Sequence, residues 1–197
     1  MIPSIETCFQ FMDRYGMLEN IKDHSVVVAG AARLITRNLC GAGGPFSLKK
    51  VTAAALMHDI GKTFSLDSGE DHAELGRRIC LQNDLVEIAD IVGEHVLLKD
   101  YRPNGPLSEK EIVYYADKRV NHDRIVSLDE RRAYILRRYG QDREDLCRGI
   151  RENFRICKEV EHRLFDRLDF FPESLSILAE EEEISHLGSL RLSLSRA

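Results

Sequence analysis

The chain has 197 residues, of which 43% are hydrophobic and 31% are charged. This composition excludes a disordered or fibrous protein and is sufficient for one domain with a real core. The formal net charge of −5 gives no reason to expect nucleic-acid or anionic-membrane partners, because both favour clustered Lys and Arg.

The five cysteines are widely spread and form no C-x-x-C pair, which argues against a disulfide framework and favours a reducing cytoplasm. The longest apolar stretch near the N-terminus is too short to span a bilayer, and the first residues lack the pattern of a signal peptide. We therefore expect a cytoplasmic protein with no membrane partner.

Apolar residues recur at intervals of three and four along most of the chain, which predicts a nearly all-α fold. Ser47 is a suitable N-cap for a helix whose stretch "VTAAALM" is apolar nearly all round and therefore central to the core. In the first half of the chain, helices are predicted over 4–15, 20–39, 48–58, 71–82 and 84–97.

The second half begins with an irregular loop, "KDYRPNGPL", at 99–107. "SEKE" at 108–111 and "SLDE" at 127–130 fit the S-x-x-E capping box, so each predicts a new helix. A long charged helix over 142–168, expected to be structural, precedes a short helix within 170–184. We expect a weakly ordered, flexible tail over 184–197, although its alternating pattern leaves strand pairing with a neighbour open.

The most informative stretch is "LMHDIGK", residues 56–62. His58 and Asp59 end the most apolar helix, where an unpaired carboxylate costs several kcal/mol unless a cation or hydrogen bonds compensate it. Gly61 permits a tight turn, and Lys62 lies within reach of the same cavity. A His-Asp pair alone is more often a hydrogen-bonded structural feature, so further evidence is needed.

Four other potential ligands occur on separate predicted helices, each at the start, the end or an embedded point of an apolar stretch. Histidine suits first-row transition metals, and a carboxylate can bridge two of them. These residues are His24, His72, His95 and Asp117.

With "KDHSVVVAG" before it and "YYADKRV" after it, "LMHDIGK" resembles the H, HD, D pattern of the HD-domain metal-dependent phosphohydrolase family, over roughly residues 20–125. The resemblance implies an all-helical bundle with the HD core at about 20–125. The rest of a single domain, 1–197, would be a C-terminal helical extension (126–183) and the tail (184–197).

The resemblance also implies a ligand set. His24, His58, Asp59 and Asp117 would hold one divalent ion, and Asp59 would bridge to a second ion held by His72 and His95. Mn, Fe, Co, Ni and Zn are the candidate metals, and Mg is a further one. The second pair, His122-Asp123, lacks the preceding apolar helix and the following glycine, so we interpret it as a loop or a substrate-side element rather than a ligand pair.

The implied activity is hydrolysis of a phosphate ester of a nucleotide or another small phosphorylated metabolite. No G-x-S-x-G or P-loop motif is present, which favours direct attack by metal-activated water. Asp59 would orient that water, and Lys62 would bind the phosphate oxygens. In the loop after His95, Lys99 and Arg102 are expected at the mouth of the site, with a solvated loop as the alternative.

Two other functions remain open at this stage. Some relatives of the family use a di-iron centre with the same ligand types to oxidise their substrates. A non-catalytic nucleotide-binding sensor would keep the metal and the ligand without turnover. The sequence leaves homo-oligomerisation open.

Overall fold

The computed structural model describes residues 1–141 and 143–194. Helices dominate these residues, and the strands found among them form one short hairpin, so the predicted all-α class is confirmed. The first helices along the chain are α1 (Ile5–Arg14), α2 (Glu19–Gly41), α3 (Leu48–Met57), α4 (Lys62–Ser68), α5 (His72–Gln82), α6 (Val86–Gly93) and α7 (Glu109–Lys118).

After α7 the chain forms an antiparallel hairpin, in which Val120 pairs with Ile125 and Asn121 with Arg124. The hairpin was not predicted, because two residues per strand are too few to show an alternating pattern. The remaining elements are β1 (Val120–Asn121), β2 (Arg124–Ile125), α8 (Leu128–Tyr139), α9 (Glu144–Phe165), η1 (Pro172–Ser174), α10 (Leu175–Ala179), η2 (Glu180–Ile184) and α11 (Ser185–Leu194).

The predicted helix starts are present. Ser47 Oγ accepts a hydrogen bond from Lys50 N at 3.2 Å. In both capping boxes, the glutamate three residues after the N-cap accepts from the N-cap amide at 2.8 Å. These bonds satisfy amide groups that a helix start leaves without intrahelical partners.

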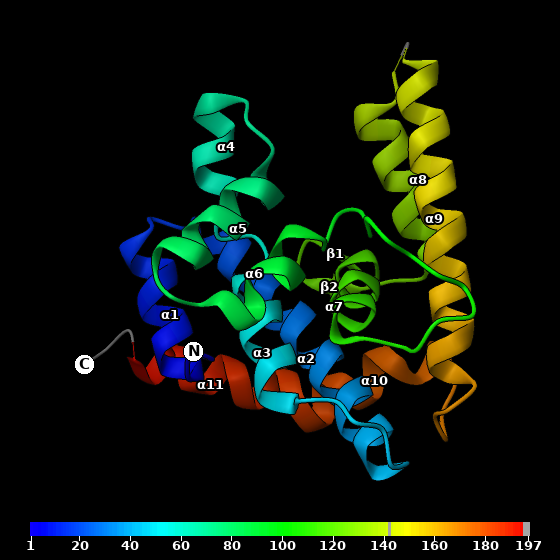
Figure 1. Ribbon diagram of the computed structural model, residues 1–197, viewed down its shortest axis with the longest axis horizontal. Helices are drawn as coiled ribbons and strands as arrows, with labels where there is room; N and C mark the ends of the chain where they lie inside the picture. Colours follow the sequence, from blue (N-terminus) through cyan, green and yellow to red (C-terminus); the bar gives the residue numbers. More distant parts are fainter. Residues whose placement is uncertain (142, 195–197) are drawn as a thin grey trace.

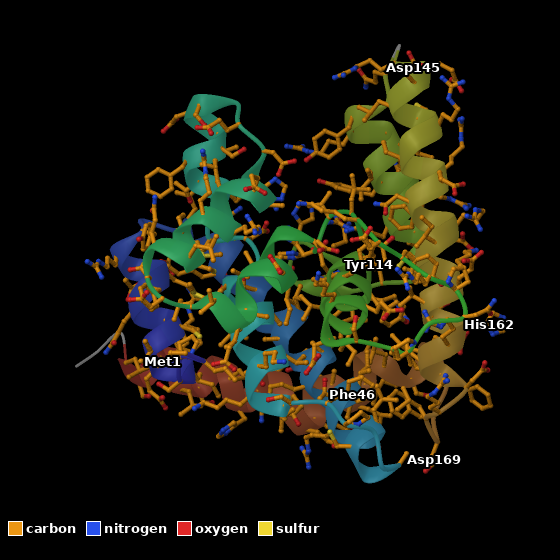
Figure 2. All side chains as sticks on the ribbon, in the orientation of Figure 1. Met1, Phe46, Tyr114, Asp145, His162 and Asp169 are labelled. Atoms are coloured by element: carbon orange, nitrogen blue, oxygen red, sulfur yellow. The ribbon has the colours of Figure 1, made fainter. Side chains whose placement is uncertain are left out.

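The core lies where α2 packs against α3 and α7 (Figure 1). Residues 51–57 of α3 are all buried, as their apolar pattern predicts. Tyr114 of α7 is fully buried and lies in the interior of the molecule, whereas His162 of α9 points outward (Figure 2). This packing fixes the three helices that carry His24, His58 and Asp117.

Two features project from this body on the same side (Figure 1). One is α4, a short helix that was not predicted and that ends at Gly69, whose φ of 71° suits glycine. The other is the pair α8 and α9, which lie side by side. Helix α9 buries Phe154, Cys157 and Val160 on the apolar face that its sequence predicts.

The expectation of a weakly ordered tail over 184–197 is wrong for 185–194, where α11 forms. Leu187 is fully buried, and the Arg191 guanidinium pairs with the carboxylates of Glu19 and Asp23 on α2. Packing and ion pairs with a distant helix therefore determine this segment, which its local alternating pattern does not show. Residues 195–197 lie outside the described residues.

Over residues 1–141 and 143–194, no helix combines the length and the apolar character that crossing a membrane requires.

Replacing Gly30 of α2 tests the packing of the C-terminal segment. A Cβ atom at Gly30 would overlap Ile184 Cγ1 and lie 3.3 Å from Ile184 N, so the Ile184 side chain would have to turn away or the two segments would have to separate. We expect Gly30→Ala to lower the free energy of unfolding by about 1–3 kcal/mol, measured by chemical denaturation.

Gly149→Ala on α9 is the matched control, because nothing lies within 4 Å of its Cβ position. This control is expected to stabilise the helix by about 0.5–1 kcal/mol. Equal effects of the two substitutions would contradict the close contact between α2 and η2.

Candidate metal centre

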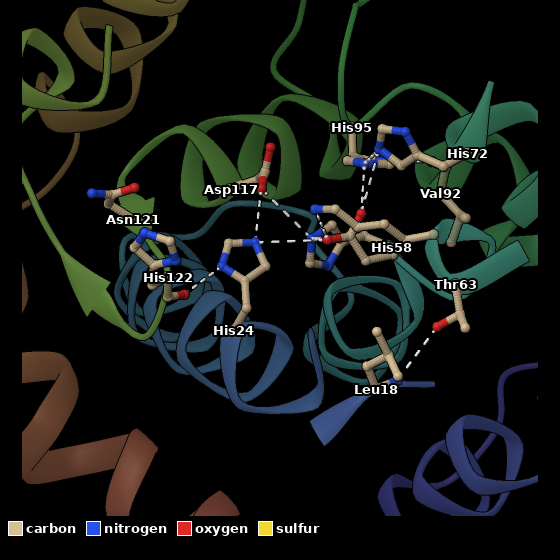
Figure 3. A network of polar contacts seen from close by, with 12 residues as sticks. Leu18, His24, His58, Thr63, His72, Val92, His95, Asp117, Asn121 and His122 are labelled. Atoms are coloured by element: carbon tan, nitrogen blue, oxygen red, sulfur yellow. Dashed lines mark hydrogen bonds and ion pairs between the residues drawn. The ribbon is translucent and has the colours of Figure 1, made fainter. Parts of the chain in front are cut away.

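The six predicted ligands converge although they come from five separate parts of the chain. Figure 3 labels His24, His58, His72, His95 and Asp117. All six side chains are buried or partly buried. The most exposed is His72, of whose side chain 28% is exposed. Their positions are His24 within α2, His58 and Asp59 directly after α3, His72 at the start of α5, His95 after α6 and Asp117 near the end of α7.

One cluster surrounds a carboxylate oxygen of Asp117. His24 Nε2 lies 3.1 Å from Asp117 Oδ1, and His58 Nε2 lies 3.6 Å from the same atom. Asp59 Oδ2 completes the cluster at 3.5 Å from His58 Nε2 and 3.9 Å from His24 Nε2. Two imidazole nitrogens and two carboxylate oxygens therefore face one another, a donor set that suits a divalent transition metal.

The other cluster surrounds the second oxygen of Asp59. Asp59 Oδ1 lies 3.4 Å from His72 Nε2 and 3.5 Å from His95 Nε2. The two imidazole nitrogens are 3.2 Å apart, and the rings lie next to each other in Figure 3. Each oxygen of Asp59 thus faces a different pair of histidines, which is the arrangement a bridging carboxylate requires.

Backbone carbonyls hold three of the histidines in the orientation needed for metal binding. The Nδ1 atoms of His24, His58 and His95 lie 2.7, 2.7 and 2.6 Å from the carbonyl oxygens of His122, Ala55 and Val92. A carbonyl oxygen only accepts, so each Nδ1 carries the proton and donates it. Each Nε2 then faces the cluster, as in metal-binding histidines. At His58, burial disfavours the charged ring, but Asp59 and Asp117 outweigh it and raise the pKa to about 9, so a metal ion there would displace the Nε2 proton.

Two buried atoms in the centre have no hydrogen-bond partner among the described residues: His58 Nε2 and Asp59 Oδ1. An unsatisfied buried polar atom costs about 1–3 kcal/mol, and more when it is charged. Both atoms point at positions where a cation would satisfy them. The residues therefore fit one or two divalent ions. One group consists of His24, His58 and Asp59 and the other of Asp59, His72 and His95, so both groups share Asp59.

The charges in the centre keep both carboxylates ionised. Burial alone would favour the neutral acid, but His58 and Lys62 hold the pKa of Asp59 well below its usual range. Lys118 and the neighbouring histidines do the same for the pKa of Asp117. Burial lowers the pKa of His72 to about 4, so this ring is neutral at pH 7 and free to bind a metal.

Lys62 lies beside the centre, as predicted. Its Nζ donates to Asp59 Oδ2 at 2.7 Å. Burial disfavours the ammonium, but Asp59 outweighs this effect, and the pKa of Lys62 is raised. Lys62 also lines a cavity of about 350 Å³ that contains parts of Asp59, His72, His95 and Asp117. A substrate in this cavity would meet both the metal ligands and the ammonium.

The two other predicted substrate-binding residues lie outside this cavity. The Lys99 side chain is 59% exposed, with its Nζ 3.9 Å from Glu74 Oε2. Arg102 lines a separate, smaller cavity of about 140 Å³. Two hydrogen bonds hold this loop: Glu94 accepts from the Lys99 amide, and Arg163 donates to the Gly105 carbonyl.

Sequence reasoning missed the part of the cavity that α8 and α9 supply, including Arg131 and Asn153. No motif marks these residues, and the long helix was expected to be structural only.

The pair His122-Asp123 is exposed and lies in the hairpin loop, as interpreted, while the His122 carbonyl orients His24. Lys118 is buried and donates to Asp117 Oδ2 and to the His95 carbonyl, both at 2.9 Å.

Comparison with known proteins agrees with this geometry. The family model described as HD domain matches residues 21–122. Ribonuclease Y of Helicobacter acinonychis (strain Sheeba) is 37% identical over 79 residues, which cover 39% of this chain and 14% of that relative. The chain thus matches only a small part of the length of this relative. No solved structure matches the chain.

The metal content of variants tests the shared position of Asp59. We expect the wild-type chain to retain about two divalent ions, His72→Ala about one and Asp59→Asn fewer than one, because only Asp59 faces both clusters. Elemental analysis after gel filtration in manganese-free buffer measures the content. His186→Ala, at an exposed histidine, should match the wild type. Full occupancy in Asp59→Asn would contradict the bridging role.

Proposed function

This chain belongs to the HD domain family, and from that premise we propose that it is a phosphohydrolase that cleaves a phosphate ester with metal-activated water. The observation that carries the proposal is the position of Asp59, whose two oxygens face two separate histidine pairs. We propose a binuclear centre, with Mn, Fe, Co, Ni, Zn or Mg as the candidate ions and a nucleotide or other small phosphorylated metabolite as the substrate.

Divalent ions at such a centre would supply Lewis acidity towards the phosphoryl group and towards water. The protein residues then have defined tasks. His24, His58, His72, His95 and Asp117 hold the ions, while the backbone carbonyls behind three of the histidines keep the rings from turning. Asp59 is buried and ionised, so it also accepts a hydrogen bond and can orient the attacking water.

Lys62 is suited to bind the non-bridging phosphate oxygens. Its ammonium is charged at neutral pH, partly exposed to the cavity and already fixed by Asp59. During phosphoryl transfer, negative charge is spread over these oxygens, and a positioned cation stabilises it. Lys62 therefore links the ligand that both clusters share to the group that would be transferred.

The composition of the cavity supports direct attack by water. Among the described residues that line it there is no Ser, Thr or Cys, and its carboxylates and imidazoles are those proposed to hold the ions. Tyr134 and Tyr139 lie on the wall contributed by α8, away from the helices that carry the metal ligands. A mechanism without a covalent intermediate therefore needs the fewest additional groups.

A di-iron oxygenase is the second candidate, because four imidazoles and two carboxylates are also the ligand types of such centres. Oxygen uptake by the iron-loaded protein, set against phosphate release by the manganese form, distinguishes the two.

The match to a protein named Ribonuclease Y favours including a short RNA among the phosphate esters tested. Ligand binding with no product under any metal would favour a sensor.

A phosphatase screen with Mn, Fe, Co, Ni, Zn and Mg over nucleotides, small phosphate esters and a short RNA tests the proposal. We expect phosphate release by the wild type and a loss of at least about 100-fold in Asp59→Asn, because both clusters lose a charged ligand. Retained activity in that variant, with the fold intact by circular dichroism, would overturn the proposed mechanism.

Lys62→Met separates phosphate binding from metal binding. We expect kcat/KM to fall by about 10–100-fold, because one positioned cation is lost, while the metal content stays that of the wild type. Lys49→Met, at an exposed lysine of α3, is the matched control and should leave kcat/KM unchanged. A loss of metal in Lys62→Met would assign this residue to the metal centre instead.

A further inference from the structure

One wall of the cavity comes from helices that contribute no metal ligand. The pair α8 and α9 projects from the body of the molecule (Figure 1), and its side chains line the cavity together with Asp59 and Lys62. Most of these side chains are aliphatic or aromatic, namely Tyr134, Ile135, Tyr139, Leu146, Ile150 and Phe154. Tyr134, Ile135, Leu146 and Ile150 are half-buried and Phe154 is buried, so the first four supply the apolar surface that a ligand could reach. Partly exposed apolar surface beside a charged centre is typical of a site that binds a partly apolar ligand.

Arg131 on α8 is the cation on this wall. Its Nη1 donates to Asn121 Oδ1 at 2.8 Å, and its guanidinium carbon lies 5.6 Å from the centre of the Tyr134 ring. These contacts fix the side chain, yet its Nε is buried and has no hydrogen-bond partner among the described residues. A buried donor without a partner costs free energy that an incoming acceptor recovers. A guanidinium held in this way is suited to the oxygens of a phosphate group.

Other polar groups of the cavity are already engaged. Asn153 Nδ2 donates to the Val96 carbonyl at 3.0 Å, and its Oδ1 accepts from Tyr114 Oη at 2.7 Å. Lys118 is held by Asp117 and the His95 carbonyl. Beyond Arg131, the hydroxyls of Tyr134 and Tyr139 are the other polar side-chain groups that α8 adds to the lining. A hydroxylated group placed against the aliphatic part of the wall would lose its water without replacement.

We infer that Arg131 binds the phosphate oxygens of the substrate and that the wall formed by Tyr134, Ile135, Leu146, Ile150 and Phe154 holds an apolar or aromatic group attached to that phosphate. The inference rests on the proposed function in one respect: it takes a phosphate as the group that meets the metal centre. It narrows the substrate to phosphate esters whose second part is apolar or flat.

Binding of non-hydrolysable phosphonates to the manganese-loaded protein tests this inference without turnover. Isothermal titration calorimetry compares phenylphosphonate with methylphosphonate and with 3,4-dihydroxybutylphosphonate, which is larger than methylphosphonate but polar. We expect phenylphosphonate to bind at least about tenfold more tightly than either of the others, because only its ring gains from burial on the wall.

Two variants separate the contributions. Arg131→Met should weaken all three phosphonates by about tenfold or more, because each loses a charge-assisted hydrogen bond. Arg132→Met is the matched control: Arg132 is the next residue of α8 and pairs with Asp129 at 3.0 Å, outside the cavity lining.

Ile150→Gln should reduce the advantage of phenylphosphonate, whereas Ile177→Gln, at an exposed isoleucine of α10, should preserve it. Metal content and thermal unfolding confirm that each variant is folded and loaded.

The outcomes are distinguishable from those of the proposed function. Equal binding of the three phosphonates, or unchanged binding in Arg131→Met, overturns this inference even if the protein hydrolyses phosphate esters. If no ester is hydrolysed under any metal but the phosphonates show the expected order, the proposed function fails and the assignment of the wall stands. Where turnover is found, Arg131→Met should raise KM about tenfold with a smaller change in kcat.

Discussion

The structure of this site depends on one buried carboxylate, Asp59, which is 1% exposed. Burying a charge is unfavourable unless opposite charges and hydrogen bonds compensate it. Asp59 has Lys62 on one oxygen and histidine pairs facing both oxygens, yet Oδ1 still has no hydrogen-bond donor among the described residues. A cation between this oxygen and the two histidines that face it would compensate the buried charge.

The helical framework fixes this convergence in two steps. Packing of α2 against α3 and α7 brings His24, His58 and Asp117 together. Hydrogen bonds from ring Nδ1 atoms to backbone carbonyls then set which nitrogen faces the centre. Because the carbonyls belong to helix ends and to the hairpin loop, the orientation of each ring is determined by the backbone rather than by a further side chain that could rotate.

The sequence predicted the parts of the site that depend on local pattern. His58-Asp59 follows an apolar helix, and the other ligands interrupt apolar stretches, so their burial could be anticipated from residues 20–125 alone. The cavity wall formed by α8 and α9 could not be predicted. The periodicity of α9 shows that Leu146 and Ile150 share a face, but it does not show which part of the molecule that face contacts. In the same way, the Leu and Ser alternation of 185–194 suggests an extended or weakly ordered segment, whereas contacts with α2 make it helical.

The hairpin between α7 and α8 connects the two halves of the site. Its loop residue His122 has a φ of 55°, which is strained for a residue other than glycine, and its carbonyl accepts from His24. The preceding residue, Asn121, accepts from Arg131, and the His122 ring packs edge-on against Tyr134. This strained turn therefore contacts His24, a predicted metal ligand, on one side and Arg131 and Tyr134 of α8 on the other. Because these contacts come from two adjacent residues, a shift of this turn would move His24, Arg131 and Tyr134 together.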